Sequence, residues 1–367
     1  MNRTNCTLCN NDDIYHYYKV DSYPLLTIAT NNTLESDIFI TLNFGICKRC
    51  KCVQLLNLVD PNLLYSYPNK SHLTNLWNEH HVSFTNFIKN IIDIKNESIC
   101  EIGGANNNLY NFFKGIKKYT VLDIYEPSVK NPDINYIQGN CESYIDYIES
   151  SLILSHTFEH LFNPIVFLNS LYKTNIKHIF ISVPNMKTYL TDKLSINIVF
   201  AEHTFYFEKE DLIYLFRRIG YEIGSSVDFK GHSIFLHFFK TEMCEQPIMI
   251  HDKSIAAEKL LNLHNNKMRL FSIVEITRPT YIMPSHYIGQ CLYYYIKNKE
   301  NVLGFLDNDT NKHNKRLYGT HLVTYPVEHI RTKKSVDVIL VKSPYYDEMY
   351  SQLVLYNTNV SIYTIEI

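Results

Sequence analysis

The sequence predicts an α/β protein built from three parts, and three observations support this prediction. Two Cys-x-x-Cys pairs lie near the N-terminus, in a region that has short strand patterns and no long amphipathic helix. A central region alternates apolar strand segments with helical segments, which is the pattern of a parallel sheet. A second, shorter alternation follows near the C-terminus. We therefore expect a small zinc-binding domain at 1–68, a Rossmann-like domain at 69–245 and a smaller Rossmann-like domain at 246–367.

The cysteine pairs of the N-terminal region predict a zinc site. The segment 37–44 alternates apolar and polar residues like a strand and leads into the second pair. Zinc prefers four ligands in a tetrahedron, and two pairs supply four thiolates, those of Cys6, Cys9, Cys47 and Cys50. A metal would hold together a segment that is too short to bury a core of its own. The alternative is four reduced cysteines without a metal.

The central region predicts a helix followed by six strands. Apolar residues recur at helical spacing over 71–93. The last two strands follow each other closely, so we expect them to form an antiparallel hairpin that closes the sheet. The predicted strands are 98–102, 119–123, 151–155, 178–183, 221–228 and 232–239.

The C-terminal region repeats this alternation on a smaller scale. A helical pattern covers 254–266 and leads into the second set of strands. We expect strands at 280–283, 302–306, 336–341 and 360–367, with helices at 286–297 and 345–355.

A glycine turn after the first central strand predicts a cofactor site. Glu101 ends an apolar strand, and Gly103 and Gly104 would let the backbone approach a ligand closely. In doubly wound folds, an acidic residue about 20 residues further on binds ribose hydroxyls. Asp123 holds that position at the end of the next strand, and Glu126 competes for the role. The alternative is a purely structural turn between strand and helix.

Further polar side chains follow the ends of other predicted strands. Because the carboxyl ends of parallel strands meet at one edge, where α/β proteins bind ligands, we expect these side chains to share the cofactor site. Taken singly, His160 is more often a satisfied polar residue than a catalytic one. The candidates are Asn106, Asn140, Cys141, Ser155, His156 and His160.

In this ordered set of motifs the chain resembles the three-domain, zinc-containing sugar C-methyltransferases that use S-adenosylmethionine (SAM). The likeness covers nearly the whole chain, and its order is more specific than any single motif. It rests on the cysteine pairs, Trp77-Asn-Glu-His80, Glu101-Ile-Gly-Gly104, Glu159-His160-Leu-Phe-Asn-Pro164, Val183-Pro-Asn185, Glu202-His-Thr-Phe-Tyr206 and Phe305-Leu-Asp-Asn308.

The resemblance implies a class I methyltransferase domain, SAM and Zn²⁺ as cofactors, and a nucleotide-linked 4-keto sugar, dTDP-linked or similar, as substrate. In that family a base removes a proton next to the keto group before the carbon is methylated. Glu202 and His203 match the catalytic pair, with His203 as base or enolate stabiliser and Glu202 fixing its tautomer. Tyr67 matches a tyrosine over the active site. The alternative for Glu202 and His203 is a polar surface pair.

Departures from the family pattern leave two other functions open. Phe200 stands where the family has a tyrosine, and the glycine loop lacks its later glycine. A sugar O-methyltransferase, which needs only a base near a hydroxyl, is the second candidate, with His203 or His232 as that base. The third is a binding or scaffold protein that has kept the fold and lost catalysis.

Charge and hydropathy argue against nucleic acid and membrane partners. The formal net charge is -2, and the one cationic cluster is the short stretch 312–316, so the sequence lacks the basic footprint of a nucleic-acid binder. No apolar run approaches the roughly 20 residues that span a bilayer. Nine cysteines in 367 residues are no disulfide scaffold, and paired cysteines favour a reducing compartment. We expect a cytoplasmic monomer or homodimer.

Overall fold

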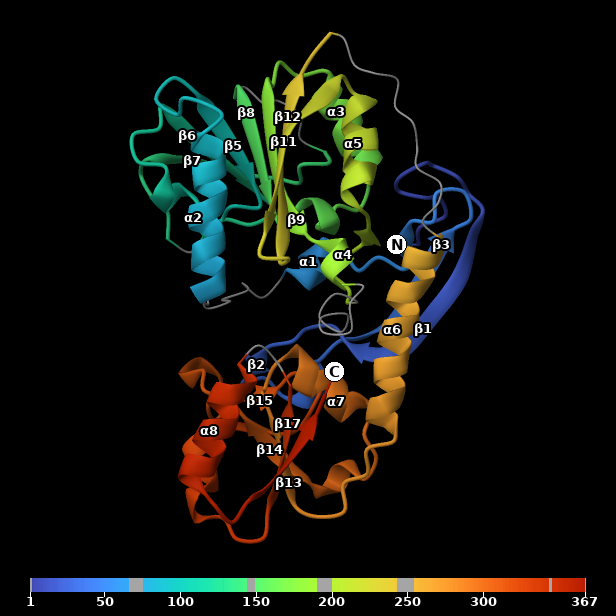
Figure 1. Cartoon of the computed structure of the whole chain (residues 1–367), viewed down its shortest axis with the longest axis vertical. Helices are drawn as coiled ribbons and strands as arrows, with labels where there is room; N and C mark the ends of the chain where they lie inside the picture. The colour runs from blue at the N-terminus through green and yellow to red at the C-terminus, as the bar shows by residue number, and fades with distance from the viewer. Residues whose placement is uncertain are drawn as a thin grey trace.

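The computed structural model confirms an α/β protein with a Rossmann-like central domain, further sheets and an N-terminal cysteine cluster (Figure 1). Figure 1 places the central domain at one end of the molecule and the C-terminal domain at the other. Strand β1 (Ile14–Pro24) and helix α6 (Ser254–Ser272) run along one side between them. The structure describes residues 2–65, 75–127, 129–143, 149–189, 200–242, 254–342 and 345–366.

The central sheet has seven strands in the order β11-β12-β9-β8-β5-β6-β7. Strands β5 to β9 pair in parallel, whereas β12 is antiparallel to both of its neighbours. The predicted closing hairpin is therefore confirmed. The strands are β5 (Ser98–Ile102), β6 (Lys118–Asp123), β7 (Ile134–Gln138), β8 (Ser151–Ser155), β9 (His178–Pro184), β11 (Tyr221–Phe229) and β12 (Ser233–Lys240).

Helices cover both faces of this sheet, which explains why its inner strands are almost wholly apolar. Helix α2 (Asn75–Lys89) buries Phe84 against Phe235 on one face, with ring centroids 4.9 Å apart. Helices α3 (Pro164–Tyr172) and α5 (Lys209–Arg217) cover the other face, where Phe216 stacks on Phe238 at 4.4 Å. The short helix α4 (Met186–Tyr189) follows β9. The segment after the glycine turn that follows β5 forms a 3₁₀ turn, Tyr110–Phe112.

The N-terminal sheet includes a strand from the central region. Its antiparallel order is β1-β3-β4-β10, in which β10 (Phe205–Tyr206) pairs with β4 (Val53–Leu55). The Arg3 guanidinium donates to the carbonyl oxygens of Thr204 at 2.6 Å and Phe162 at 2.7 Å. These contacts fasten the N-terminal sheet to the cavity side of the central domain. The remaining elements here are β2 (Ala29–Thr30), β3 (Phe39–Cys47) and α1 (Pro61–Leu64).

The C-terminal domain is a parallel sheet with helices on both faces, as the sequence predicts. Its strand order is β16-β14-β13-β17-β18. Helices α6 and α7 pack on one face together with the N-terminal strands, and α8 packs on the other. Helix α6 is longer than the 254–266 expected. The elements are β13 (Thr280–Met283), α7 (Tyr287–Tyr295), β14 (Val302–Leu306), β15 (Arg316–Leu317), β16 (Thr324–Tyr325), β17 (Asp337–Val341), α8 (Tyr346–Tyr356) and β18 (Ser361–Ile365).

Within the described residues, no helix is both long and apolar enough to cross a membrane.

Candidate functional site

A cavity of about 560 Å³ lies at the carboxyl edge of the central parallel strands, where all three parts of the chain meet. The central domain contributes the turn after β5 and the ends of β6 and β8. The N-terminal segment 23–28 forms a second wall, and His286 and Tyr287 at the start of α7 form a third. This edge is where α/β sheets bind ligands, and the size is typical of a small-molecule site.

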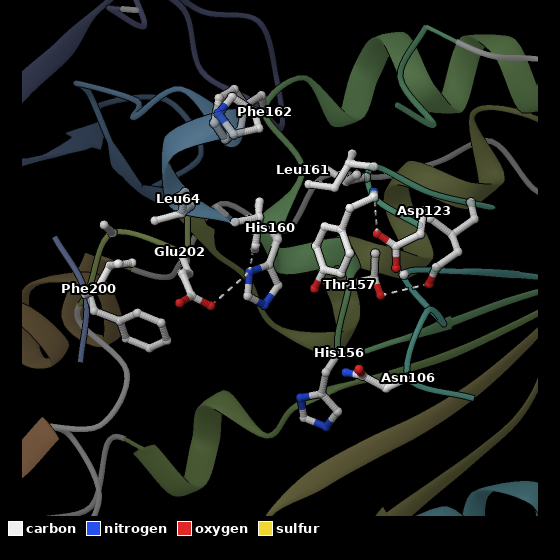
Figure 2. Close-up of a pocket in the computed structure, with 18 of the residues that line it drawn as sticks. Leu64, Asn106, Asp123, His156, Thr157, His160, Leu161, Phe162, Phe200 and Glu202 are labelled. Atoms are coloured by element: carbon white, nitrogen blue, oxygen red, sulfur yellow. Dashed lines mark hydrogen bonds and ion pairs between the residues drawn. The ribbon is translucent and has the colours of Figure 1, made fainter. Parts of the chain in front are cut away.

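The glycine turn and Asp123 form one end of the cavity. Gly103 has a φ of +79°, and a Cβ there would lie 2.7 Å from Oγ1 of Thr157, so the turn needs glycine at this position. The Asp123 carboxylate accepts the N–H of Ala105 at 3.0 Å, which ties the end of β6 to the turn. Burial raises the pKa of Asp123. Figure 2 shows Asp123 and Asn106 on the same side of the cavity.

Eight of the eleven predicted cofactor residues line this cavity. Asn140 is held by the backbone N–H of Glu142, which donates to its Oδ1 at 2.8 Å. His156 adopts a left-handed φ of 50°, and its Nε2 lies 2.9 Å from Oγ of Ser233. The eight are Gly103, Asn106, Asp123, Asn140, Cys141, Ser155, His156 and His160.

The other three lie away from the cavity. Glu101 is buried behind the turn, where it accepts the Tyr119 hydroxyl at 2.7 Å, and burial raises its pKa to about 7. A Cβ on Gly104 would lie 2.4 Å from the Glu101 carboxyl group, so Gly104 makes room for that side chain. Glu126 is exposed and pairs with Lys130 at 3.0 Å. Glu101 and Gly104 therefore support the turn from within the domain.

The opposite end of the cavity is formed by Phe200, Glu202 and His160 (Figure 2). Nδ1 of His160 lies 4.0 Å from Oε2 of Glu202 and 3.2 Å from the Tyr65 hydroxyl. Removal of Glu202 from water raises the pKa of its carboxyl group, and the charge of His160 opposes that rise. A carboxylate with a raised pKa facing a cavity can accept a proton from a bound molecule.

The two histidines predicted to be catalytic do not line the cavity. His203 is buried beside it, with its ring centroid 4.4 Å from that of Phe200 and 5.1 Å from that of His160. His232 lies further away, where its Nδ1 is 2.7 Å from Oγ of Ser233, and burial lowers its pKa to about 4. Tyr67 lies outside the described residues.

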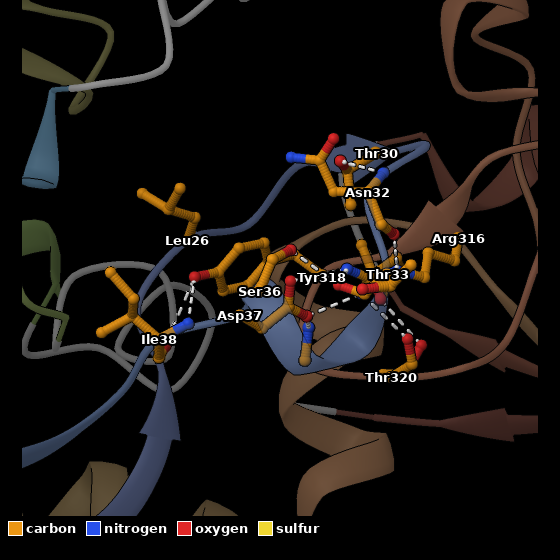
Figure 3. Close-up of polar contacts among 12 residues, drawn as sticks. Leu26, Thr30, Asn32, Thr33, Ser36, Asp37, Ile38, Arg316, Tyr318 and Thr320 are labelled. Atoms are coloured by element: carbon orange, nitrogen blue, oxygen red, sulfur yellow. Dashed lines mark hydrogen bonds and ion pairs between the residues drawn. The ribbon is translucent and has the colours of Figure 1, made fainter.

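The C-terminal domain holds the N-terminal wall of the cavity in place (Figure 3). The Arg316 guanidinium donates to both carboxylate oxygens of Asp37 at 2.6 Å, in a pair whose side chains are only 10% and 1% exposed. The side-chain amide of Gln290 donates to the carbonyl oxygens of Leu26 at 2.8 Å and Tyr318 at 2.7 Å. The segment that lines the cavity is thus positioned from two points of the C-terminal domain.

Sequence reasoning missed these walls and one further group. His286, Tyr287 and the segment 23–28 carry no motif, and only the folded chain brings them to the strand ends. Glu159 belongs to the motif that runs from Glu159 to Pro164, whose spacing gives no sign that its carboxylate lies buried beside histidines.

The four predicted metal ligands come together in the N-terminal part. The sulfur atoms of Cys6 and Cys50 lie 3.4 Å apart and those of Cys9 and Cys47 lie 3.6 Å apart, and all four fall within 4.8 Å of one another. Tetrahedral zinc with bonds of about 2.3 Å places its sulfur ligands about 3.8 Å apart. The cluster therefore fits a structural zinc ion.

No family model matches the chain, and no curated protein matches its sequence. Among solved structures, the magnesium protoporphyrin IX methyltransferase of Synechocystis PCC 6803 with bound SAM is similar over 50% of this chain and 99% of its own, at 10% identity and a TM-score of 0.39. A putative SAM-dependent methyltransferase of Listeria monocytogenes matches 43% of this chain and 98% of its own, at 12% identity and a TM-score of 0.36.

Proposed function

We propose that this chain is a SAM-dependent methyltransferase. The observation that carries the proposal is the cavity at the carboxyl edge of the central sheet, where the glycine turn and Asp123 lie together. In doubly wound folds, a glycine turn after the first strand and an acidic residue after the second cradle a nucleoside. The seven-stranded sheet with its closing hairpin also agrees with the class I methyltransferase domain that the sequence motifs imply.

The two ends of the cavity suit two different tasks. At one end, Asp123 would hold the ribose hydroxyls of the cofactor, and Asn140 and Cys141 would frame its adenine. SAM, when bound, supplies the methyl group. At the other end, Glu202 would take the proton that the acceptor loses, because its carboxylate faces the cavity and its pKa is raised. His160 lies beside Glu202 and would orient the acceptor.

We further propose a nucleotide-linked sugar as the acceptor. Support comes from the likeness to sugar methyltransferases and from the cavity walls of the N- and C-terminal parts, which add polar and aromatic groups such as Thr27 and Tyr287. Methylation of a carbon next to a 4-keto group is the first candidate. Methylation of a hydroxyl is the second, because Phe200 beside His203 offers no hydroxyl to stabilise an enolate oxygen.

Calorimetry with S-adenosylhomocysteine tests the cofactor site. We expect zinc-loaded protein to bind one molecule per chain, and Asp123→Asn to weaken binding by on the order of tenfold or more, because the amide loses the charge that holds the ribose. Glu126→Gln is the matched control, since this acidic side chain is exposed and outside the cavity. Absence of binding by folded wild-type protein would refute the methyltransferase and favour a scaffold role.

Mass spectrometry of nucleotide sugars incubated with SAM tests the acceptor. The expected product gains the mass of one methylene group. Carbon methylation requires loss of hydrogen from carbon, so a substrate deuterated next to the keto group would lose deuterium, whereas O-methylation would retain it. A protein that binds S-adenosylhomocysteine and methylates no nucleotide sugar would contradict the sugar assignment alone.

A further inference from the structure

Glu159, His160 and His203 form a cluster of metal-ligating side chains beside the cavity, apart from the four cysteines. Glu159 and His160 belong to the 3₁₀ turn Phe158–His160 after β8, and His203 lies just before β10. Each side chain offers one ligand atom, and the three atoms lie within 4.8 Å of one another. Two segments that lie about 40 residues apart in the sequence therefore bring one carboxylate and two imidazoles together.

Glu159 is the unusual member of this cluster. Its side chain is almost fully buried, and among the described residues neither carboxylate oxygen has a hydrogen-bond partner. Its Oε1 lies 3.3 Å from Nδ1 of His156, a contact that is an ion pair only when that imidazole is protonated. A buried carboxylate is costly unless it is paired or coordinates a metal. A ligand that satisfies this group is therefore expected.

Histidine binds metals as the neutral imidazole and glutamate as the ionised carboxylate. The cluster offers both kinds of ligand at one place in the fold.

We propose that Glu159, His160 and His203 bind a divalent transition metal. Two histidines and one carboxylate are the ligand set of catalytic zinc sites and of non-haem iron sites, which leave positions open for another ligand. Metal–ligand bonds of about 2.1 Å put tetrahedral ligand atoms about 3.4 Å apart. This spacing is compatible with three ligand atoms that lie within 4.8 Å of one another.

The open side of this site faces the acceptor end of the cavity, because His160 and the neighbouring Glu202 both line it. A metal here would polarise an oxygen of the acceptor as a Lewis acid and help Glu202 to take its proton. This role rests on the proposed methyl transfer, whereas metal binding itself does not. In the absence of SAM, the site should still bind the ion.

A Co²⁺ titration of zinc-loaded protein tests the site. We expect one Co²⁺ per chain to bind without release of zinc, with visible absorption of nitrogen and oxygen ligation and no thiolate charge-transfer band. Glu159→Gln should weaken Co²⁺ binding by at least on the order of tenfold, because the charged ligand is lost, and His203→Asn should do likewise. Circular dichroism would verify that each variant is folded.

Glu149→Gln is the matched control, because Glu149 is also a buried carboxylate but lies outside the cluster, next to Thr120 at 2.7 Å. It should bind Co²⁺ as wild type does. Zinc-loaded wild type that binds no further Co²⁺, or a folded Glu159→Gln variant that binds it equally well, overturns the proposal. Calorimetry with S-adenosylhomocysteine on the same samples separates the two proposals, since either ligand can bind while the other fails.

Discussion

Replacement of Glu101 by glutamine should change how the stability of the protein depends on pH. Glu101 lies behind the glycine turn, buried and bonded to the Tyr119 hydroxyl at 2.7 Å. Burial raises the pKa of its carboxyl group from 4.5 to about 7, and the Tyr119 hydroxyl limits that rise. Glutamine keeps the size and an acceptor oxygen for Tyr119 but does not titrate in this range.

The sign and size of this stability change follow from the pKa values of Glu101 in the unfolded and the folded chain. The unfolded chain releases this proton near pH 4.5 and the folded chain near pH 7. The contribution of Glu101 to stability is therefore fully present below about pH 4.5 and is lost as the pH rises through about 7. The shift corresponds to about 3 kcal/mol, of which about 2 kcal/mol falls above pH 5.5. We expect Glu101→Gln to gain that amount relative to wild type between about pH 5.5 and 8.5.

Urea unfolding of zinc-loaded protein at several pH values measures this difference. The range starts near pH 5.5 because more acidic solutions protonate zinc-bound thiolates. Tyr119→Phe is a useful companion, since loss of the hydroxyl should raise the pKa of Glu101 further and move the loss of stability to higher pH. A constant difference between Glu101→Gln and wild type across the range would show that Glu101 titrates near its ordinary pKa and would refute the reasoning.

Three further predictions concern other parts of the molecule. Asp37→Asn should lower the free energy of unfolding, measured in urea titrations, by on the order of 3 kcal/mol, because it leaves Arg316 buried with its charge unbalanced. A loss below about 1 kcal/mol would contradict this expectation. Gly103→Ala should lower the free energy of unfolding by roughly 1–2 kcal/mol, because φ is +79° and the new methyl group would meet Thr157. It should also weaken S-adenosylhomocysteine binding in calorimetry, and unchanged binding would be inconsistent with a tight turn. Chelation of zinc should lower the melting temperature measured by circular dichroism, and an unchanged melting profile after verified zinc removal would argue against a structural metal.

The central sheet could be predicted from the sequence because both of its faces are covered. Its inner strands are short apolar runs bounded by polar turns, and the hairpin has two such runs in close succession. The strand β10 could not be predicted in this way, since two residues, Phe205 and Tyr206, carry no periodicity. Its pairing with β4 depends on contacts between segments that lie far apart in the sequence.

Only the part of the site that lies at the strand ends could be predicted from the sequence. Asp123 and Ser155 are the last residues of their strands and Asn140 follows one, and the parallel sheet necessarily brings them to one edge. Glu101 is a residue of β5 itself, and alternate residues of a strand point to opposite faces, so its identity alone could not tell which way its carboxylate points. The walls at 23–28 and at His286 come from tertiary packing and have no local signature.

The ion pair between Asp37 and Arg316 limits how the chain could be truncated or recombined with other chains. The cavity has a wall that belongs to the N-terminal segment yet is fixed by residues more than half the chain away, Gln290 and Arg316. A truncated protein that lacks the C-terminal domain would lose that anchor. A chimaera that takes its C-terminal domain from another protein would therefore need the segment 23–38 from the same donor, and the two would have to change together for the cavity to accept a new ligand.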